Sequence, residues 1–165
     1  MNIYSPNELI AGITNEFRIM KHLWSKVTPE NKWHKLTDAQ RSIEELEHYI
    51  ISSFPAQIKL MVLGKRDEAV YNEYVAKFEG YTHEQFDTQI DAALQSIIAD
   101  ISSVSASQRS EEISIRGMTK PRSGFLIDYV FTFLGAYKMQ LFLQLKHAGL
   151  KDLTTYNLWA GIDHK

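Results

Sequence analysis

The first part of the chain has apolar residues at alternating three- and four-residue steps, which is the spacing of one face of an α-helix. This stripe consists of Ile10, Ile13, Phe17, Met20, Trp24 and Val27. Before it, Ser5-Pro6-Asn7-Glu8 combines an N-cap hydroxyl, a proline at the first helical position and a glutamate that can close a capping box. The pattern predicts a helix that begins after Ser5 and is interrupted by Thr28-Pro29.

A second apolar line predicts a second long helix. It is formed by Ile43, Leu46, Ile50, Ser53 and Gln57, with Ile51, Phe54, Ile58 and Met61 beside it. We expect this helix to begin at Thr37-Asp38-Ala39-Gln40, a second capping-box pattern, and to end at Gly64. Pro55 lies inside the line and removes a backbone donor, so it should kink or divide the helix.

The remaining segments are also helical in pattern. A short helix is expected around residues 66–78, and Thr82-His83-Glu84-Gln85 is a third capping signal. The clearest amphipathic stretch follows it, with Phe86, Ile90, Ala93, Leu94, Ile97 and Ile101 on one face. Residues 102–122 form a long polar connection, in which Ile113-Ser114-Ile115 alternates as an extended segment would, but three residues do not decide this. The last helix is expected over about residues 123–148, with Gly149 after its end.

Four principal helices with one long connection before the last predict an all-α four-helix bundle with essentially no sheet. At 165 residues, we expect one domain over residues 1–165 with a single core. The tail after Gly149 is too apolar to remain in water, because it contains Leu150, Leu153, Tyr156, Leu158, Trp159 and Ile162. It must pack on its own bundle or against a second copy, and we favour its own bundle.

Composition narrows the classes of function. The net charge is −2 and the basic residues are scattered, so nucleic acid and anionic membranes are not expected partners. There are no cysteines, which excludes disulfides, thiolate metal sites and a cysteine nucleophile. The apolar run 125–143 carries Asp128 and Lys138 and fits a bundle helix better than a membrane span. Residues 1–8 contain no secretion signal, so we expect a cytoplasmic protein.

Several short motifs together resemble those of the DinB/YfiT-like superfamily. Trp33-His34-Lys35-Leu36-Thr37 and then Arg41-Ser42-Ile43-Glu44-Glu45-Leu46 are similar to the family's tryptophan, short loop and R-S-x-x-E-L entry into the second helix. Tyr137-Lys138-Met139-Gln140-Leu141 stands where the family has H-R-G-Q-L, and Leu145-Lys146-His147-Ala148-Gly149 resembles L-R-x-x-G. Their order and spacing over residues 5–163 carry the resemblance, which implies a four-helix bundle and a homodimer.

The resemblance also implies a metal site of three histidines, one from the second helix and an H-x-x-x-H pair from the last. The positions of the pair read Phe133 and Tyr137 here, and the L-x-x-H-I pattern maps its histidine onto Tyr49. A shift of one residue would make His48 a ligand instead. At about 100° per residue from Ile43, however, Tyr49 flanks the apolar line while His48 falls on the far side, towards solvent. We therefore expect no metal and no other cofactor.

Tyr49, Phe133, Tyr137 and Gln140, with Gln144 nearby, define the candidate site between the second and last helices. The rings fill the vacated space, with a tyrosine–glutamine hydrogen bond satisfying the polar ends, or they line a pocket for a small molecule. The first hypothesis for function is a metal-free small-molecule-binding or interaction module of DinB-like type. The alternative is a thiol-dependent transferase or metal-dependent enzyme of that type, so whether the chain is an enzyme stays open.

The other polar residues have simpler interpretations. His22, His34, His83, His147 and His164 are taken as scattered surface histidines. Glu44, Glu45 and Glu47 are taken as one solvated acidic face. Asp128 is expected either to pair with Lys21, Arg18 or another basic group or to face solvent.

Overall fold

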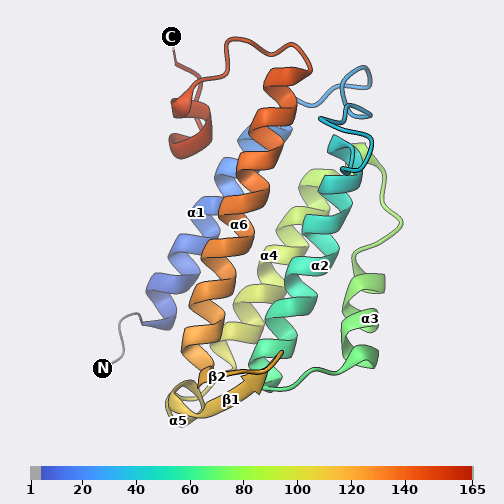
Figure 1. Ribbon diagram of the computed structural model, residues 1–165. Helices are drawn as coiled ribbons and strands as arrows, with labels where there is room; N and C mark the ends of the chain where they lie inside the picture. The colour runs from blue at the N-terminus through green and yellow to red at the C-terminus, as the bar shows by residue number, and fades with distance from the viewer. Residues whose placement is uncertain (1–4, 165) are drawn as a thin grey trace.

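The computed structural model describes residues 5–164 and is built mainly of helices, which confirms the all-α prediction (Figure 1). Residues 1–4, on which the expectation of no secretion signal partly rests, lie outside the described residues. The bundle consists of α1 (Pro6–Trp24), α2 (Ile43–Leu63), α4 (Phe86–Ser102) and α6 (Arg122–His147). The shorter elements are α3 (Glu68–Lys77), η1 (His83–Gln85), α5 (Ala106–Ser110), β1 (Glu112–Ile115), β2 (Met118–Pro121) and η2 (Tyr156–Ala160). None of the helices described is long and apolar enough to cross a membrane.

The N-terminal capping boxes locate the helix starts, with one correction. Ser5 and Glu8 form the predicted reciprocal pair at the start of α1. The second helix does not begin at Thr37, as predicted, but at Ile43, where Ser42 and Glu45 form the capping box. Both segments match the capping pattern, but only the second leads directly into buried residues, so packing decides between them.

Pro55 does not divide the second helix. α2 continues through it from Ile43 to Leu63, and Pro55 is buried among the other helices. The missing backbone hydrogen bond is tolerated because tertiary packing contributes more to a buried helix than one bond does. Gly64 then ends the helix in the left-handed conformation with φ of 73°, as predicted.

The long connection contains a small antiparallel hairpin, which corrects the expectation of essentially no sheet. β1 and β2 pair from Glu112 with Pro121 to Ile115 with Met118. Arg116 and Gly117 form the two-residue turn, and both have positive φ, at 53° and 78°. Such a turn matches the twist of paired strands, but three alternating residues in the sequence are too few to reveal it.

A junction at this end of the bundle holds the hairpin to α2. A Cβ atom on Gly64 would lie 2.9 Å from Ile113 Cγ2 and 3.0 Å from Arg122 Nη2, so only glycine fits there. The buried Arg122 guanidinium donates to the carbonyl oxygens of Val62 and Gln108 and pairs with Glu111 at 2.7 Å. The hairpin therefore has a defined position over the C-terminal end of α2.

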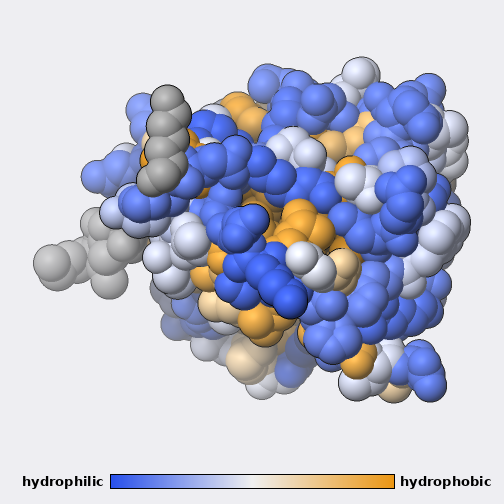
Figure 2. Space-filling model, turned by 90° about the horizontal axis from the view of Figure 1, so that it is seen from above, coloured by the Kyte–Doolittle hydropathy of each residue, from blue (hydrophilic) through white to orange (hydrophobic). Residues whose placement is uncertain are grey.

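The tail packs on its own bundle, as we favoured. Leu153 and Leu158 are buried, and η2 lies against α1. Arg18 Nη2 donates to the carbonyl oxygen of Ala160 at 2.8 Å. Figure 2 shows the end of the bundle at which the tail lies, where hydrophilic residues surround a smaller apolar area.

Substitutions in the tail test this packing. Leu158→Ala should lower the free energy of unfolding by about 2–4 kcal/mol, because it removes buried apolar volume. Ile162→Ala is the matched control and should cost less than about 1 kcal/mol, because Ile162 is 51% exposed. Urea denaturation measures both. Equal effects of the two substitutions would show that Leu158 is not docked.

Candidate functional site

The structure brings three of the four candidate residues together as a cluster of packed rings. Tyr49 extends from α2, and Phe133 and Tyr137 from α6, with ring centroids 4.5–5.8 Å apart. Phe54 and Tyr129 continue the cluster, each in contact with Phe133. Rings at these distances and angles are in favourable contact, so side chains occupy the space between the two helices. We refer to these five residues as the ring cluster.

Gln140 lies outside the ring cluster. It lines, with Tyr137 and Arg41, an open depression between α6 and residues 35–45. The expected tyrosine–glutamine hydrogen bond does not form: the buried Gln144 donates to the carbonyl oxygen of Arg41 at 2.7 Å, and Tyr49 bonds to Tyr137 instead. The Arg41 guanidinium covers the Tyr49 ring at 3.8 Å.

The donor atoms of the ring cluster do not fit a three-histidine metal site. Burial and the hydrogen bond with Tyr137 raise the pKa of Tyr49 from 10.0 to about 12. The phenol is therefore protonated at neutral pH, and a protonated phenol is a poor metal ligand. The cluster contains no imidazole and no carboxylate. Within residues 5–164, no group of three His, Cys, Asp or Glu side chains is arranged to hold a metal ion.

His48 does not point to the ring cluster, nor is it fully in solvent as expected. Its half-buried ring stacks on Tyr81, with centroids 4.3 Å apart. Burial lowers the pKa of His48, which favours the neutral imidazole.

Glu47 contradicts the interpretation of a solvated acidic face. Its side chain is buried, and its carboxylate accepts hydrogen bonds from Trp24 Nε1 and from His83 Nδ1, the latter at 3.3 Å. Burial raises the pKa of Glu47 from 4.5 to about 7, although the bond from Trp24 and the nearby His83 act in the opposite direction. The sequence did contain a signal, because Glu47 follows Ile43 by four residues and precedes Ile50 by three.

The histidines are also not all scattered. His34 Nε2 lies 2.7 Å from His147 Nδ1, so the connection before α2 meets the end of α6. The pair is 113 residues apart in the chain, and no local pattern could reveal it. Asp128 pairs with Lys120, one of the open possibilities, and not with Lys21 or Arg18.

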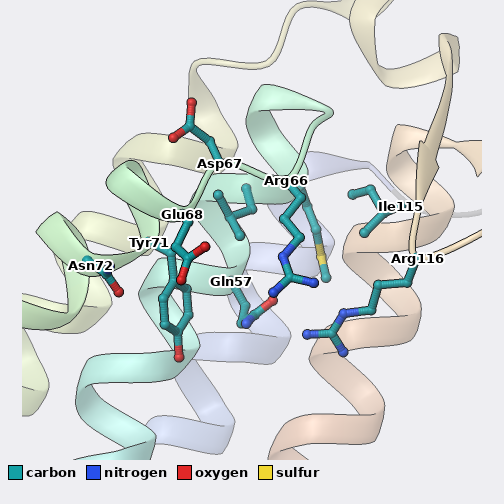
Figure 3. Close-up of a pocket in the computed structure, with 10 residues that line it drawn as sticks. Gln57, Arg66, Asp67, Glu68, Tyr71, Asn72, Ile115 and Arg116 are labelled. Carbon is teal, nitrogen blue, oxygen red and sulfur yellow. The ribbon is translucent and has the colours of Figure 1, made fainter.

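A cavity of about 270 Å³ lies beside the ring cluster, between α2, α3 and the hairpin (Figure 3). Gln57, Arg66, Tyr71 and Arg116 contribute polar atoms to it. Leu60 and Met61 from α2 and Ile115 from the hairpin contribute apolar side chains to it. Sequence reasoning missed this cavity because its walls come from three segments, one of them the unpredicted hairpin.

Tyr71 joins this cavity to the ring cluster. Its hydroxyl lies 3.2 Å from the Ser53 hydroxyl on α2, one turn after Tyr49. The Tyr71 side chain also contributes to raising the pKa of Tyr49 and Tyr129, which places it within electrostatic range of both. The cavity and the ring cluster therefore share one face of α2.

The buried Glu47 should make stability depend on pH. Its pKa in the folded protein exceeds the ordinary value, so the folded state binds the proton more tightly and stability falls as pH rises from about 4.5 to 7. Glu47→Gln should remove a decrease on the order of 2–3 kcal/mol over this range. Urea denaturation followed by tryptophan fluorescence at pH 5, 6, 7 and 8 measures it.

Glu73→Gln is the control for this experiment, because Glu73 is exposed on α3. Its stability should follow the pH profile of the unsubstituted protein. If the profile of the Glu47→Gln variant ran parallel to that of the unsubstituted protein, the proposed proton uptake at Glu47 would be wrong.

Comparison with known proteins identifies the fold. No protein-family model and no curated protein matches the chain. Among solved structures, the chain is similar to the crystal structure of YjoA, a DinB-like protein from Bacillus subtilis, with a TM-score of 0.70 and 16% sequence identity. The match covers 90% of this chain and 96% of that chain. The resemblance seen in the sequence is thus confirmed at the level of the fold: this chain has the fold of a DinB-like protein.

Proposed function

We propose that this chain is a DinB-like binding protein that acts without the three-histidine metal site and that holds a small molecule in the cavity between α2, α3 and the hairpin. The observation that carries the proposal is the ring cluster. Tyr49, Phe133 and Tyr137 occupy the positions assigned to the metal ligands by resemblance, and their rings pack against one another. The cavity lies further along the same face of α2, and Tyr71 lies between it and these rings.

The shape and lining of the cavity support a ligand of metabolite size. Its volume is near the lower end of the range for small-molecule sites. Its lining combines three apolar side chains with seven polar or charged ones, so burial can supply affinity and the polar groups can set orientation. The Gln57 amide makes no hydrogen bond with another described residue, so it can bond to a ligand.

Rebuilding the histidine site tests the metal part of the proposal. The purified protein should contain less than about one tenth of an ion of zinc, nickel or iron per chain, because its ring cluster lacks suitable donors. The triple variant Tyr49→His, Phe133→His, Tyr137→His should bind about one zinc ion per chain. Elemental analysis after gel filtration compares the two. A stoichiometric metal in the unsubstituted protein would contradict the proposal.

Filling the cavity tests the binding part. Screening a library of anionic, cationic and neutral metabolites by thermal shift should identify compounds that raise the melting temperature, because a ligand of the folded state stabilises it. Gln57→Phe should abolish these shifts by placing a ring in the cavity. Gln95→Phe, on an exposed position of α4, should leave them unchanged. If no compound stabilises the protein, or if both variants behave alike, the cavity is not the binding site.

A further inference from the structure

Arg66 and Arg116 reach the cavity from different elements. Arg66 lies between the end of α2 and Asp67, the N-cap residue of α3, and Arg116 lies in the hairpin turn. In Figure 3 both guanidinium groups extend into the cavity, on the side of the Gln57 amide. Two delocalised cations from separate parts of the chain thus face one small space.

Neither of these two guanidinium groups forms a hydrogen bond, an ion pair or a ring contact within residues 5–164, whereas every other arginine does. The other arginines bond to backbone carbonyls, to side-chain oxygens or to a ring: Arg18, Arg41, Arg109 and Arg122. The acid nearest in sequence, Asp67, is already engaged with the Val70 amide and with Lys65. The positive charge of Arg66 and Arg116 is therefore not neutralised by hydrogen-bonded carboxylates.

The backbone holds Arg116 in a conformation that its residue type does not favour. Its φ of 53° lies in the left-handed region, where Asn or Gly is preferred in a two-residue hairpin turn. The hairpin itself cannot shift freely, because Ile113 packs on Gly64 and Arg122 bonds to Gln108 and Glu111. The Arg116 guanidinium is therefore presented to the cavity by a fixed scaffold.

We propose that this cavity binds a small organic anion, in which a carboxylate or phosphate group is attached to a short apolar body. Arg66 and Arg116 hold the anionic group, since the planar guanidinium forms paired hydrogen bonds with such oxygens. Leu60, Met61 and Ile115 cover the apolar body. This inference rests on the proposed small-molecule function and adds the chemical class of the ligand.

Glu68 restricts which anions fit. Glu68 also lines the cavity, and its charge is opposite to that of the arginines. Its carboxylate has no ion-pair partner among the described residues. A ligand with a second negative group near Glu68 would be repelled. The apolar body of the ligand should therefore carry no further acid.

Titration with three matched probes tests the proposal. Phenylacetate and phenyl phosphate carry the two candidate anionic groups, and phenylacetamide is the neutral counterpart of phenylacetate. We expect at least one anion to bind at least about tenfold more tightly than phenylacetamide, because charge-assisted hydrogen bonds are lost in the amide. Chemical shifts of the backbone amides and of the arginine Nε–H groups, recorded at low salt, give the dissociation constants and identify the arginines in contact.

Substitutions assign the effect to the two arginines. Arg66→Gln and Arg116→Asn should each weaken binding of the anion by about ten- to a hundredfold. Arg116→Asn should not lower the melting temperature, because asparagine suits the turn, so lost binding cannot be attributed to unfolding. Lys151→Gln removes the same charge from the exposed turn after α6 and should leave the affinity unchanged.

The outcomes separate this inference from the proposed function. If phenylacetamide binds in the cavity as tightly as both anions, and the arginine variants bind the anions as tightly as the unsubstituted protein does, the anion proposal is wrong and the small-molecule function stands. If Lys151→Gln weakens binding as much as the arginine variants, the attraction is a general effect of charge and the proposal is also wrong. If no compound of any charge binds, both proposals fail.

Discussion

The end of the bundle that contains the cavity depends on the hydrogen bonds and the ion pair of the Arg122 guanidinium. A buried charge is stable only when its donors are satisfied, and here they bond to Val62 at the end of α2, to Gln108 in α5 and to Glu111 before β1. One side chain thereby joins the start of α6 to three other segments. The absence of a side chain at Gly64 leaves the room that this guanidinium and Ile113 occupy. Through this junction the hairpin, and with it Arg116, is placed over α2.

The long helices could be predicted because each carries its own local signal. Ser5 and Glu8 mark the start of α1, and Gly64 marks the end of α2, as the structure confirms. The signal was ambiguous where two capping patterns stand five residues apart, at Thr37 and Ser42. Both satisfy the local rule, and the choice depends on which one leads into the core. Capping residues thus define the possible ends of a helix, and tertiary packing determines which of these ends forms.

The functional features were harder to predict because they depend on contacts between distant segments. Glu47 was assigned to the surface from its neighbours Glu44 and Glu45, although its spacing from Ile43 and Ile50 places it on the apolar face. Helical position, and not residue type, decides the burial of Glu47. The cavity had no comparable signal, because its walls are brought together only by the fold. The ring cluster could be predicted in part, because the resemblance and the helical spacing place Tyr49, Phe133 and Tyr137 together.

α2 presents different chemistry on two faces, and this explains how one helix serves both the core and the site. Glu47 and His48 face the η1 side of the bundle. Trp24 and His83 hydrogen-bond to Glu47 there, and Tyr81 stacks on His48. Tyr49, Ser53 and Gln57 face α6, α3 and the cavity. The packed rings restrict one another, because aromatic side chains in mutual contact have few alternative rotamers, and none of them lines the cavity itself. In our proposal, the rings that stand where the resemblance expects imidazoles therefore pack α2 against α6, and the following turns of the same helix contribute Gln57, Leu60 and Met61 to the cavity.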